Sequence, residues 1–184
     1  MTKIVRPNGI FEEFKMNDLS YPFLRETFLD ALETSGSVSA DSGWEPIHLK
    51  IENSESSTFM PLYLKNHSMG EYVFDYSWAN AYHQHGLDYY PKLVTAIPFT
   101  PSTGDRIRSD SDLNNGHCDD LFSEVKVIAN ETGASSWHIL FPNDLQLNLL
   151  YNLDLLQRSA VQYHWININY ESFDHYLSAM TSRK

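Results

Sequence analysis

Cysteine is almost absent from this chain of 184 residues, because Cys118 is its single cysteine. One cysteine cannot form an intrachain disulfide, and a chain without disulfides suits a reducing compartment. We therefore expect a cytoplasmic protein. Long apolar runs are absent as well. No stretch approaches the roughly 20 apolar residues of a membrane-spanning helix, and residues 1–10 have no apolar signal-peptide core. The sequence predicts no membrane span and no export signal.

Positive charge is scarce. The chain has 13 Lys and Arg residues against 24 Asp and Glu residues, which gives a formal net charge of -11 at pH 7. The resulting negative field repels phosphate backbones and anionic lipid headgroups. We therefore expect no nucleic-acid partner and no binding to an anionic membrane surface.

Glycine and proline are also sparse. The chain has eight of each, and no Gly-rich or Pro-rich linker divides it. Hydrophobic residues make up 42% of the sequence and aromatic residues 14%, which is enough for a folded core. We expect one domain over residues 1–184.

The first half of the chain predicts a helix, a hairpin and a further strand. After Ser20, a favourable N-cap, apolar residues recur at helical spacing over residues 21–35. Residues 47–52 and 59–64 are β-prone segments on either side of a polar turn, which predicts a β-hairpin. In residues 71–78 aromatic side chains alternate with others, which predicts another strand.

The second half alternates strands and helices. Its predicted elements are a buried strand at 93–97, a helix at 119–132, a strand at 137–141, a helix at 144–153, a strand at 161–165 and a helix at 173–180. This alternation requires crossover connections and a partly parallel sheet. We therefore predict a mixed α/β (α+β) fold.

Aromatic residues are concentrated between Glu71 and Lys92. This segment contains Tyr72, Phe74, Tyr76, Trp78, Tyr82, Tyr89 and Tyr90. Aromatic faces with polar neighbours are typical of a sugar- or peptide-binding groove, although alternate aromatics also pack against a sheet. Both interpretations stay open. The groove hypothesis assigns substrate binding to Lys65, His67, Tyr72, Asp75, Trp78, Tyr82, Lys92 and Gln162.

Histidine supplies the candidate general base. His138 and His164 both lie in β-prone segments, where a hydrogen-bonded structural histidine is the commoner role. If one of them is catalytic, His164 is the better candidate, because it shares a strand face with Gln162. His83 and His85 are accompanied by no HExxH motif and no cysteine pair, so we expect no metal site.

Several short motifs follow one another along the chain from about Ser20 onward. They are Tyr21-Pro22-Phe23-Leu24, Gly43-Trp44-Glu45-Pro46, Pro61-Leu62-Tyr63-Leu64-Lys65-Asn66-His67-Ser68, Gly70-Glu71-Tyr72-Val73-Phe74-Asp75, Tyr89-Tyr90-Pro91-Lys92-Leu93, Pro98-Phe99-Thr100-Pro101 and Gln162-Tyr163-His164-Trp165. In this combination the chain resembles the FemAB-like "peptidoglycan biosynthesis/recognition" family of bacterial proteins. The order of elements in the second half is similar to that of the GNAT acyltransferases.

This resemblance implies a GNAT-like acyl-CoA N-acyltransferase fold, with a mixed central sheet flanked by helices. Members of the family look like tandem GNAT-like proteins about twice this length. The resemblance therefore implies that residues 1–184 are the N-terminal half of a longer protein. We then expect either a homodimer or docking against a C-terminal half.

A GNAT enzyme holds the CoA pyrophosphate on backbone amides of a glycine-rich turn at a helix N-terminus. The resemblance places this turn at residues 101–106, where Thr103, Gly104 and Arg106 would bind the cofactor. The turn has one glycine where the superfamily pattern has two, and aspartates are frequent from Asp105 to Asp120. Because these carboxylates repel a pyrophosphate, we expect no cofactor in this half, with acyl-CoA as a donor in the full-length protein.

Two functions stay open. In the first, the full protein is related to N-acyltransferases, catalysis depends on positioning and oxyanion stabilisation, and this half binds a cell-wall-type amine or peptide acceptor. In the second, this half is a non-catalytic module that recognises a peptidoglycan precursor, which is a sugar-peptide. The aromatic segment suits both functions, and the acidic turn favours the second.

Overall fold

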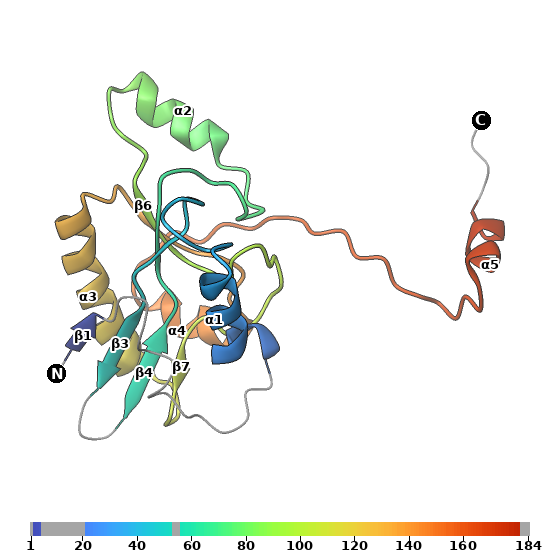
Figure 1. The fold of residues 1–184 in the computed structure, drawn as a ribbon, viewed down its shortest axis with the longest axis horizontal. Coiled ribbons are helices and arrows are strands. Elements are labelled where there is room, and N and C mark those ends of the chain that lie inside the picture. The colour runs from blue at the N-terminus through green and yellow to red at the C-terminus, as the bar shows by residue number, and fades with distance from the viewer. Residues whose placement is uncertain (1, 5–20, 53–55, 181–184) are drawn as a thin grey trace.

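The computed structural model describes residues 2–4, 21–52 and 56–180, which form helices and two β-sheets (Figure 1). Ser20, the predicted N-cap, and residues 53–55 of the predicted turn lie outside the described residues. The mixed α+β class is confirmed. The described strands form two four-stranded sheets instead of one central sheet, and the GNAT-like fold stays a prediction.

The first helical region is divided in two. The 3-10 helix η1 (Pro22–Leu24) begins with a proline, whose fixed φ suits the start of a helix. Arg25 is then extended, with ψ of 142°, and α1 (Glu26–Thr34) follows. The helix predicted at 21–35 is therefore present with one break. The buried side chains that pack together here are Leu24, Leu29, Phe59 and Ile97.

The first sheet contains the predicted hairpin. Its strands lie in the order β1 (Thr2–Ile4), β3 (Leu49–Glu52), β4 (Ser57–Met60) and β7 (Arg108–Ser109), and every pair is antiparallel. β3 and β4 pair with Leu49 opposite Met60. The chain leaves this sheet at Pro61, which has no N–H to donate to a ladder.

The second sheet contains the parallel pair that the sequence predicts. Its strands lie in the order β2 (Glu45–Pro46), β5 (Tyr63–Lys65), β6 (Lys92–Thr95) and β8 (Trp137–Ile139). β6 is buried along its whole length, as a continuous apolar run predicts. β6 and β8 are parallel, and the connection between them contains α3 (Asn115–Thr132).

The largest core joins both sheets to α3 and to α4 (Asp144–Tyr151). Its buried members include Leu49, Ile51, Met60, Leu93, Leu121, Val125, Ile128 and Leu150. α3 supplies residues at i, i+4 and i+7 to this core, which is the spacing of one helix face. The helix begins with a capping box between Asn114 and His117 and ends at Gly133, whose φ is 69°.

The strand predicted at residues 71–78 is not present. Residues 71–75 are irregular, and α2 (Tyr76–Gln84) follows them. Tyr72 has a positive φ of 58°, which an extended strand cannot contain. α2 lies at the edge of the molecule in Figure 1, and none of its residues is buried. The alternation of aromatic residues therefore does not reflect a sheet face.

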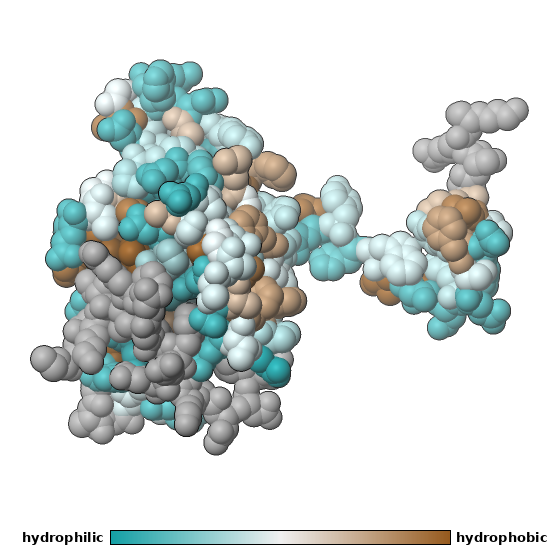
Figure 2. All heavy atoms as spheres, viewed as in Figure 1, coloured by the Kyte–Doolittle hydropathy of each residue, from teal (hydrophilic) through white to brown (hydrophobic). Residues whose placement is uncertain are grey.

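The strand predicted at residues 161–165 is also wrong. Residues 155–180, the C-terminal arm, contact the body through Arg158 and Gln162, then extend away from it and end in the short helix α5 (Phe173–Ser178), which lies within the predicted 173–180 helix (Figure 1). Every residue from 156 to 169 is exposed, and no described strand pairs with them. Figure 2 shows apolar atoms gathered around α5 at the end of the arm. A β-prone sequence forms a strand only when a sheet edge pairs with it.

Candidate active site: the Lys92 cluster

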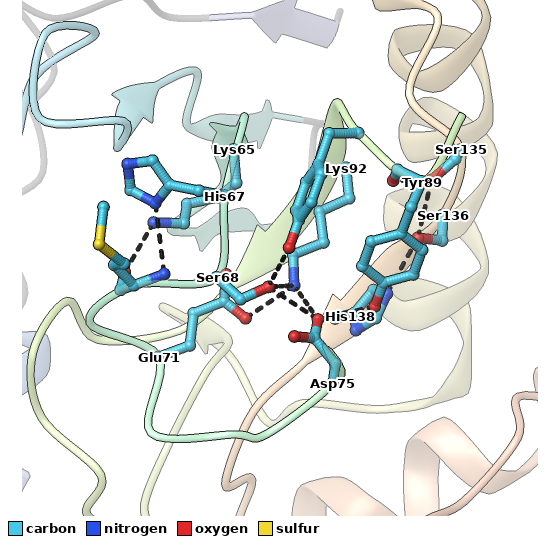
Figure 3. Close-up of polar contacts among 12 residues, drawn as sticks. Lys65, His67, Ser68, Glu71, Asp75, Tyr89, Lys92, Ser135, Ser136 and His138 are labelled. Atoms are coloured by element: carbon cyan, nitrogen blue, oxygen red, sulfur yellow. Dashed lines mark hydrogen bonds and ion pairs between the residues drawn. The ribbon is translucent and has the colours of Figure 1, made fainter. Parts of the chain in front are cut away.

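Lys92 is the first residue of β6, and its fully buried ammonium group is the centre of a polar cluster (Figure 3). Lys92 Nζ lies 2.6 Å from Asp75 Oδ2 and 2.9 Å from Glu71 Oε2. It also donates a hydrogen bond to Ser68 Oγ at 2.7 Å. A buried ammonium requires such partners, because an unpaired charge in the interior is very costly. We call residues Ser68, Glu71, Asp75, Tyr89, Tyr90 and Lys92 the Lys92 cluster.

The loop between β5 and α2 brings both carboxylates to Lys92. Gly70 has a φ of 80°, and a Cβ atom at this position would lie 2.6 Å from the ring of Phe99. Only glycine fits here, because the backbone runs directly against that ring. After this turn Glu71 and Asp75 face the start of β6 (Figure 3). Asp75 is at the same time the N-cap residue of α2.

Two tyrosines complete the cluster from the segment that precedes β6. Tyr89 OH donates a hydrogen bond to Asp75 Oδ2 at 2.7 Å. Tyr90 OH lies 2.8 Å from Ser68 Oγ. Asp75 Oδ2 therefore accepts hydrogen bonds from an ammonium, a phenol and a serine hydroxyl.

The two carboxylates have opposite pKa shifts. Burial raises the pKa of Glu71, and the neighbouring Lys92 ammonium opposes this shift only in part. Burial also acts to raise the pKa of Asp75, but its hydrogen bonds outweigh burial and hold that pKa below the usual value. The hydrogen bonds around Asp75 therefore favour its ionised form. Glu71 Oε1 and Asp75 Oδ1 are buried, and no hydrogen-bond partner within the described residues satisfies them.

Lys65 is a second buried lysine beside this cluster. Burial lowers the pKa of Lys65 to about 8, an effect that Glu71 opposes and Lys92 strengthens. Its ammonium donates to the carbonyl oxygen of Met69 at 3.1 Å and lies 3.6 Å from the centre of the Trp44 ring. The cation–π contact replaces part of the hydration that the ammonium loses.

His138 on β8 lies on the other side of Tyr89. Its Nε2 atom is 2.9 Å from Ser136 Oγ, and its ring meets the edge of the Tyr89 ring at 6.1 Å. Burial lowers the pKa of His138 to about 4, and the Lys92 ammonium adds to this shift. His138 is therefore a neutral imidazole at pH 7.

The comparison with protein families identifies this chain. A sequence model of the FemAB-like family, described as peptidoglycan biosynthesis/recognition, matches residues 10–184. The chain belongs to the FemAB-like family. No curated protein and no solved structure matches this FemAB-like chain. Within the residues described, no helix is long and apolar enough to cross a membrane.

The FemAB-like chain brings together three of the residues predicted to bind substrate. Lys65, Asp75 and Lys92 lie in or beside the Lys92 cluster (Figure 3). His67 lies next to Lys65 but packs against Gly43, where a Cβ atom would lie 2.0 Å from the imidazole Nε2. The predicted roles of these residues in binding stay predictions.

Three of the predicted aromatic residues lie on the exposed side of the same region. Tyr72 is 57% exposed, in the loop that carries Glu71. Tyr82, on α2, meets the ring of Tyr89 at 5.2 Å. Trp78, also on α2, is 41% exposed, and the Arg158 guanidinium lies 4.4 Å from the centre of its ring. These aromatics are therefore near the cluster, although α2 carries them instead of a strand.

Gln162 and His164 lie on the C-terminal arm, away from the Lys92 cluster. Gln162 donates to the carbonyl oxygen of Pro101 at 2.8 Å. His164 is exposed. The strand that would have placed both side chains on one sheet face is not formed, so the reason for choosing His164 as a base does not hold.

In the turn predicted to bind the cofactor, Arg106 and Gly104 are held by contacts with other parts of the chain. Arg106 is fully buried and donates to the carbonyl oxygens of Leu140 at 2.7 Å and Ser102 at 2.6 Å. Gly104 packs against Tyr21, whose ring would lie 2.2 Å from an added Cβ. Thr103 is exposed. The turn leads into β7, whereas α3 begins only at Asn115, so no helix N-terminus directly follows it. Cofactor binding by this turn stays a prediction.

The sequence prediction missed Ser68, Glu71, Tyr89 and Tyr90 as functional residues. Each belongs to a motif that carries the family resemblance. All four lie around Lys92, which is paired with Lys65 across β5 and β6. The sequence alone does not place these segments side by side.

Proposed function

We propose that this FemAB-like chain binds a cell-wall-type amine or peptide acceptor for an N-acyltransferase-related reaction. The observation that carries the proposal is the Lys92 cluster, a buried charge network that reaches half-exposed hydroxyl groups at Ser68 and Tyr90. Perturbed ionisable groups in a polar cluster are typical of functional sites.

The surface around this cluster suits an amphipathic sugar-peptide. Tyr72, Phe74 and Tyr76 are exposed next to the buried carboxylates. Aromatic faces give sugars a flat apolar contact, and hydroxyl groups fix the orientation of the ligand by hydrogen bonds. The acceptor therefore lies over the loop between β5 and α2, with its reacting end at Ser68.

The proposal includes an acyl donor, but it does not place the donor at the turn predicted to bind the cofactor. Arg106 uses its guanidinium to bind carbonyl oxygens of this chain, and a phosphate would have to displace them. We therefore place acyl-CoA binding, if acyl-CoA is the donor, outside residues 101–106.

Calorimetric titration of the chain with a disaccharide-pentapeptide tests acceptor binding. We expect saturable binding that weakens about fivefold in Tyr72→Ala, because removal of an aromatic anchor costs more than about 1 kcal/mol. Tyr163→Ala is the matched control, since Tyr163 is 97% exposed on the arm. No heat with this ligand, or equal weakening in both variants, contradicts the proposal.

A non-catalytic recognition module is the second candidate, and the engaged guanidinium of Arg106 favours it. This module would bind the same sugar-peptide and transfer no acyl group. Mass spectrometry of the ligand after incubation with acyl-CoA or an aminoacyl ester separates the two functions. An acylated amine supports the transferase, and binding without acylation supports the module.

A further inference from the structure

Ser68 is the point at which the Lys92 cluster reaches the surface. The residue is half-buried, whereas its partners Asp75 and Lys92 are buried. It lies three residues after the end of β5, in the turn that contains Gly70. A small molecule that approaches the cluster from solvent therefore meets the hydroxyl groups of Ser68 and Tyr90 before it meets the charges.

The hydrogen bonds of Ser68 assign a role to each neighbour. A serine hydroxyl has one proton to donate and two lone pairs to accept with. Ser68 Oγ donates to Asp75 Oδ2 at 2.8 Å and accepts from Lys92 Nζ at 2.7 Å. Because the hydroxyl proton of Ser68 points to Asp75, Ser68 Oγ accepts the hydrogen bond from Tyr90 OH at 2.8 Å. A carboxylate is thus in position to take the proton, and an ammonium to stabilise the oxygen that loses it.

We propose that Ser68 Oγ is a nucleophile that accepts the acyl group of an activated carboxylic ester or thioester. The arrangement matches the general form of an activated serine, with a proton acceptor within hydrogen-bond reach and a neighbouring cation. This inference rests on the proposed function, because it gives that function a covalent acyl-enzyme step.

Transfer of the acyl group to Ser68 requires only these groups and the acyl donor. Ser68 Oγ attacks the acyl carbon, and its proton passes to Asp75 Oδ2. The bond between the acyl carbon and the leaving oxygen or sulfur breaks, and the leaving group takes the proton from Asp75. Tyr90 OH moves from Ser68 Oγ to the carbonyl oxygen that becomes negative, and donates to it.

The acceptor amine completes the transfer. Its nitrogen attacks the acyl carbon of the Ser68 ester, and one of its protons passes to Asp75. The bond from the acyl carbon to Ser68 Oγ then breaks, and Ser68 takes that proton back. The net result is an amide and a free serine, with no redox change.

Intact-mass spectrometry with a fluorophosphonate probe and with p-nitrophenyl acetate tests the proposal on the whole chain. We expect one covalent adduct on the peptide that contains Ser68, and no adduct there in Ser68→Ala. Hydroxylamine should release the acetyl adduct, because it cleaves esters. Ser136→Ala is the matched control: Ser136 lies 2.9 Å from His138 and is the competing serine.

Two further variants test the assigned roles, each with its fold checked by circular dichroism. Asp75→Asn should slow adduct formation about 100-fold, which is a typical effect of removing a general base. Tyr90→Phe leaves the buried ions in place and should slow acetylation about tenfold, as loss of one oxyanion donor costs at least that much. It therefore tests the proposal even if Asp75→Asn does not fold.

Three results overturn the proposal: no adduct in the folded wild-type chain, an adduct that persists in Ser68→Ala, or equal acetylation rates in wild type and Tyr90→Phe. These probes need no acceptor ligand. A chain that forms the Ser68 adduct but does not bind the disaccharide-pentapeptide contradicts the proposed function alone. The opposite pattern contradicts the nucleophile alone.

Discussion

Lys92 Nζ and Asp75 Oδ2 lie 2.6 Å apart, and both side chains are at least nine-tenths buried. The two residues come from different local structures, one from the start of β6 and the other from the start of α2. Together with the ring contact between Tyr82 and Tyr89, this contact ties the start of α2 to the second sheet.

Lys92→Met should destabilise the fold by about 3–5 kcal/mol, because it leaves the buried carboxylates of Glu71 and Asp75 without their cation. Urea unfolding followed by circular dichroism measures this loss. Lys126→Met replaces an exposed lysine and should change the free energy of unfolding by less than about 0.5 kcal/mol. Adding Glu71→Gln and Asp75→Asn to Lys92→Met should restore part of the loss, and a triple variant less stable than Lys92→Met argues against this account.

His138 should make the fold less stable as the pH falls from about 6.5 to about 4. Its pKa is lowered to about 4 in the folded chain, from 6.5, so the unfolded chain binds the proton more readily over this range. The stability is fully present above pH 6.5 and decreases by up to about 3 kcal/mol as the pH reaches 4. His138→Gln should remove this part of the pH dependence.

The pH dependence is measured by urea unfolding at a series of pH values. His85→Gln is the control, because His85 is exposed. Identical pH profiles for wild type and His138→Gln would refute the assignment.

Gly70→Ala should destabilise the chain far more than Gly86→Ala. Both glycines have a positive φ, so each alanine costs about 1–2 kcal/mol in backbone strain. At Gly86 nothing lies within 4 Å of the added Cβ, whereas at Gly70 the Phe99 ring lies 2.6 Å away. Overpacking of this kind adds about 1–3 kcal/mol. Thermal and urea unfolding of the two variants measure the difference, and equal losses would mean that the Phe99 ring moves aside freely.

Removal of residues 161–184 should leave the stability of the body nearly unchanged. Among the described residues, Leu153 is the last buried one, so the arm contributes little to the core. Leu153→Ala, by contrast, should cost about 2–5 kcal/mol, because it opens a cavity in the main core. Urea unfolding of both variants tests this contrast. A shortened chain that loses as much stability as Leu153→Ala contradicts the prediction.

The main body of the fold could be predicted because its signals are local. The apolar run at Leu93 predicted the buried strand β6, and the spacing of Leu121, Val125 and Ile128 predicted α3. Asn143 accepts a hydrogen bond from the backbone of Gln146, as the start predicted for α4 requires. These elements depend on residues a few positions apart, and their periodicity is in the sequence.

The two wrong strands have a common physical cause. The sequence from Tyr72 to Trp78 and that from Val161 to Trp165 both alternate large side chains, which suits a pleated strand. A strand also needs a partner, and pairing is decided by the whole fold. In the first segment the left-handed Tyr72 ends the extended chain, and α2 begins four residues later.

The candidate site was only partly predictable for a different reason. Lys65 follows the predicted strand 59–64, and Asp75 and Lys92 flank aromatic residues, so the sequence predicts these three as binding residues. The sequence does not predict Ser68 and Glu71, because a hydroxyl and a carboxylate in a polar loop have no distinctive pattern. Their role follows from the fold of a loop around Gly70, and a contact across more than 20 positions is invisible to local periodicity.

The passage of the chain from one sheet to the other at Pro61 has a mechanical consequence. β4 and β5 are separated only by Pro61 and Leu62, and the backbone N–H of Leu62 donates to His48 Nδ1, while His48 Nε2 contacts Glu33. His48 thereby connects α1 to the short link between the two sheets. Because this link has only two residues, we expect a tilt of one sheet against the other to shift Lys65 and the turn that follows it.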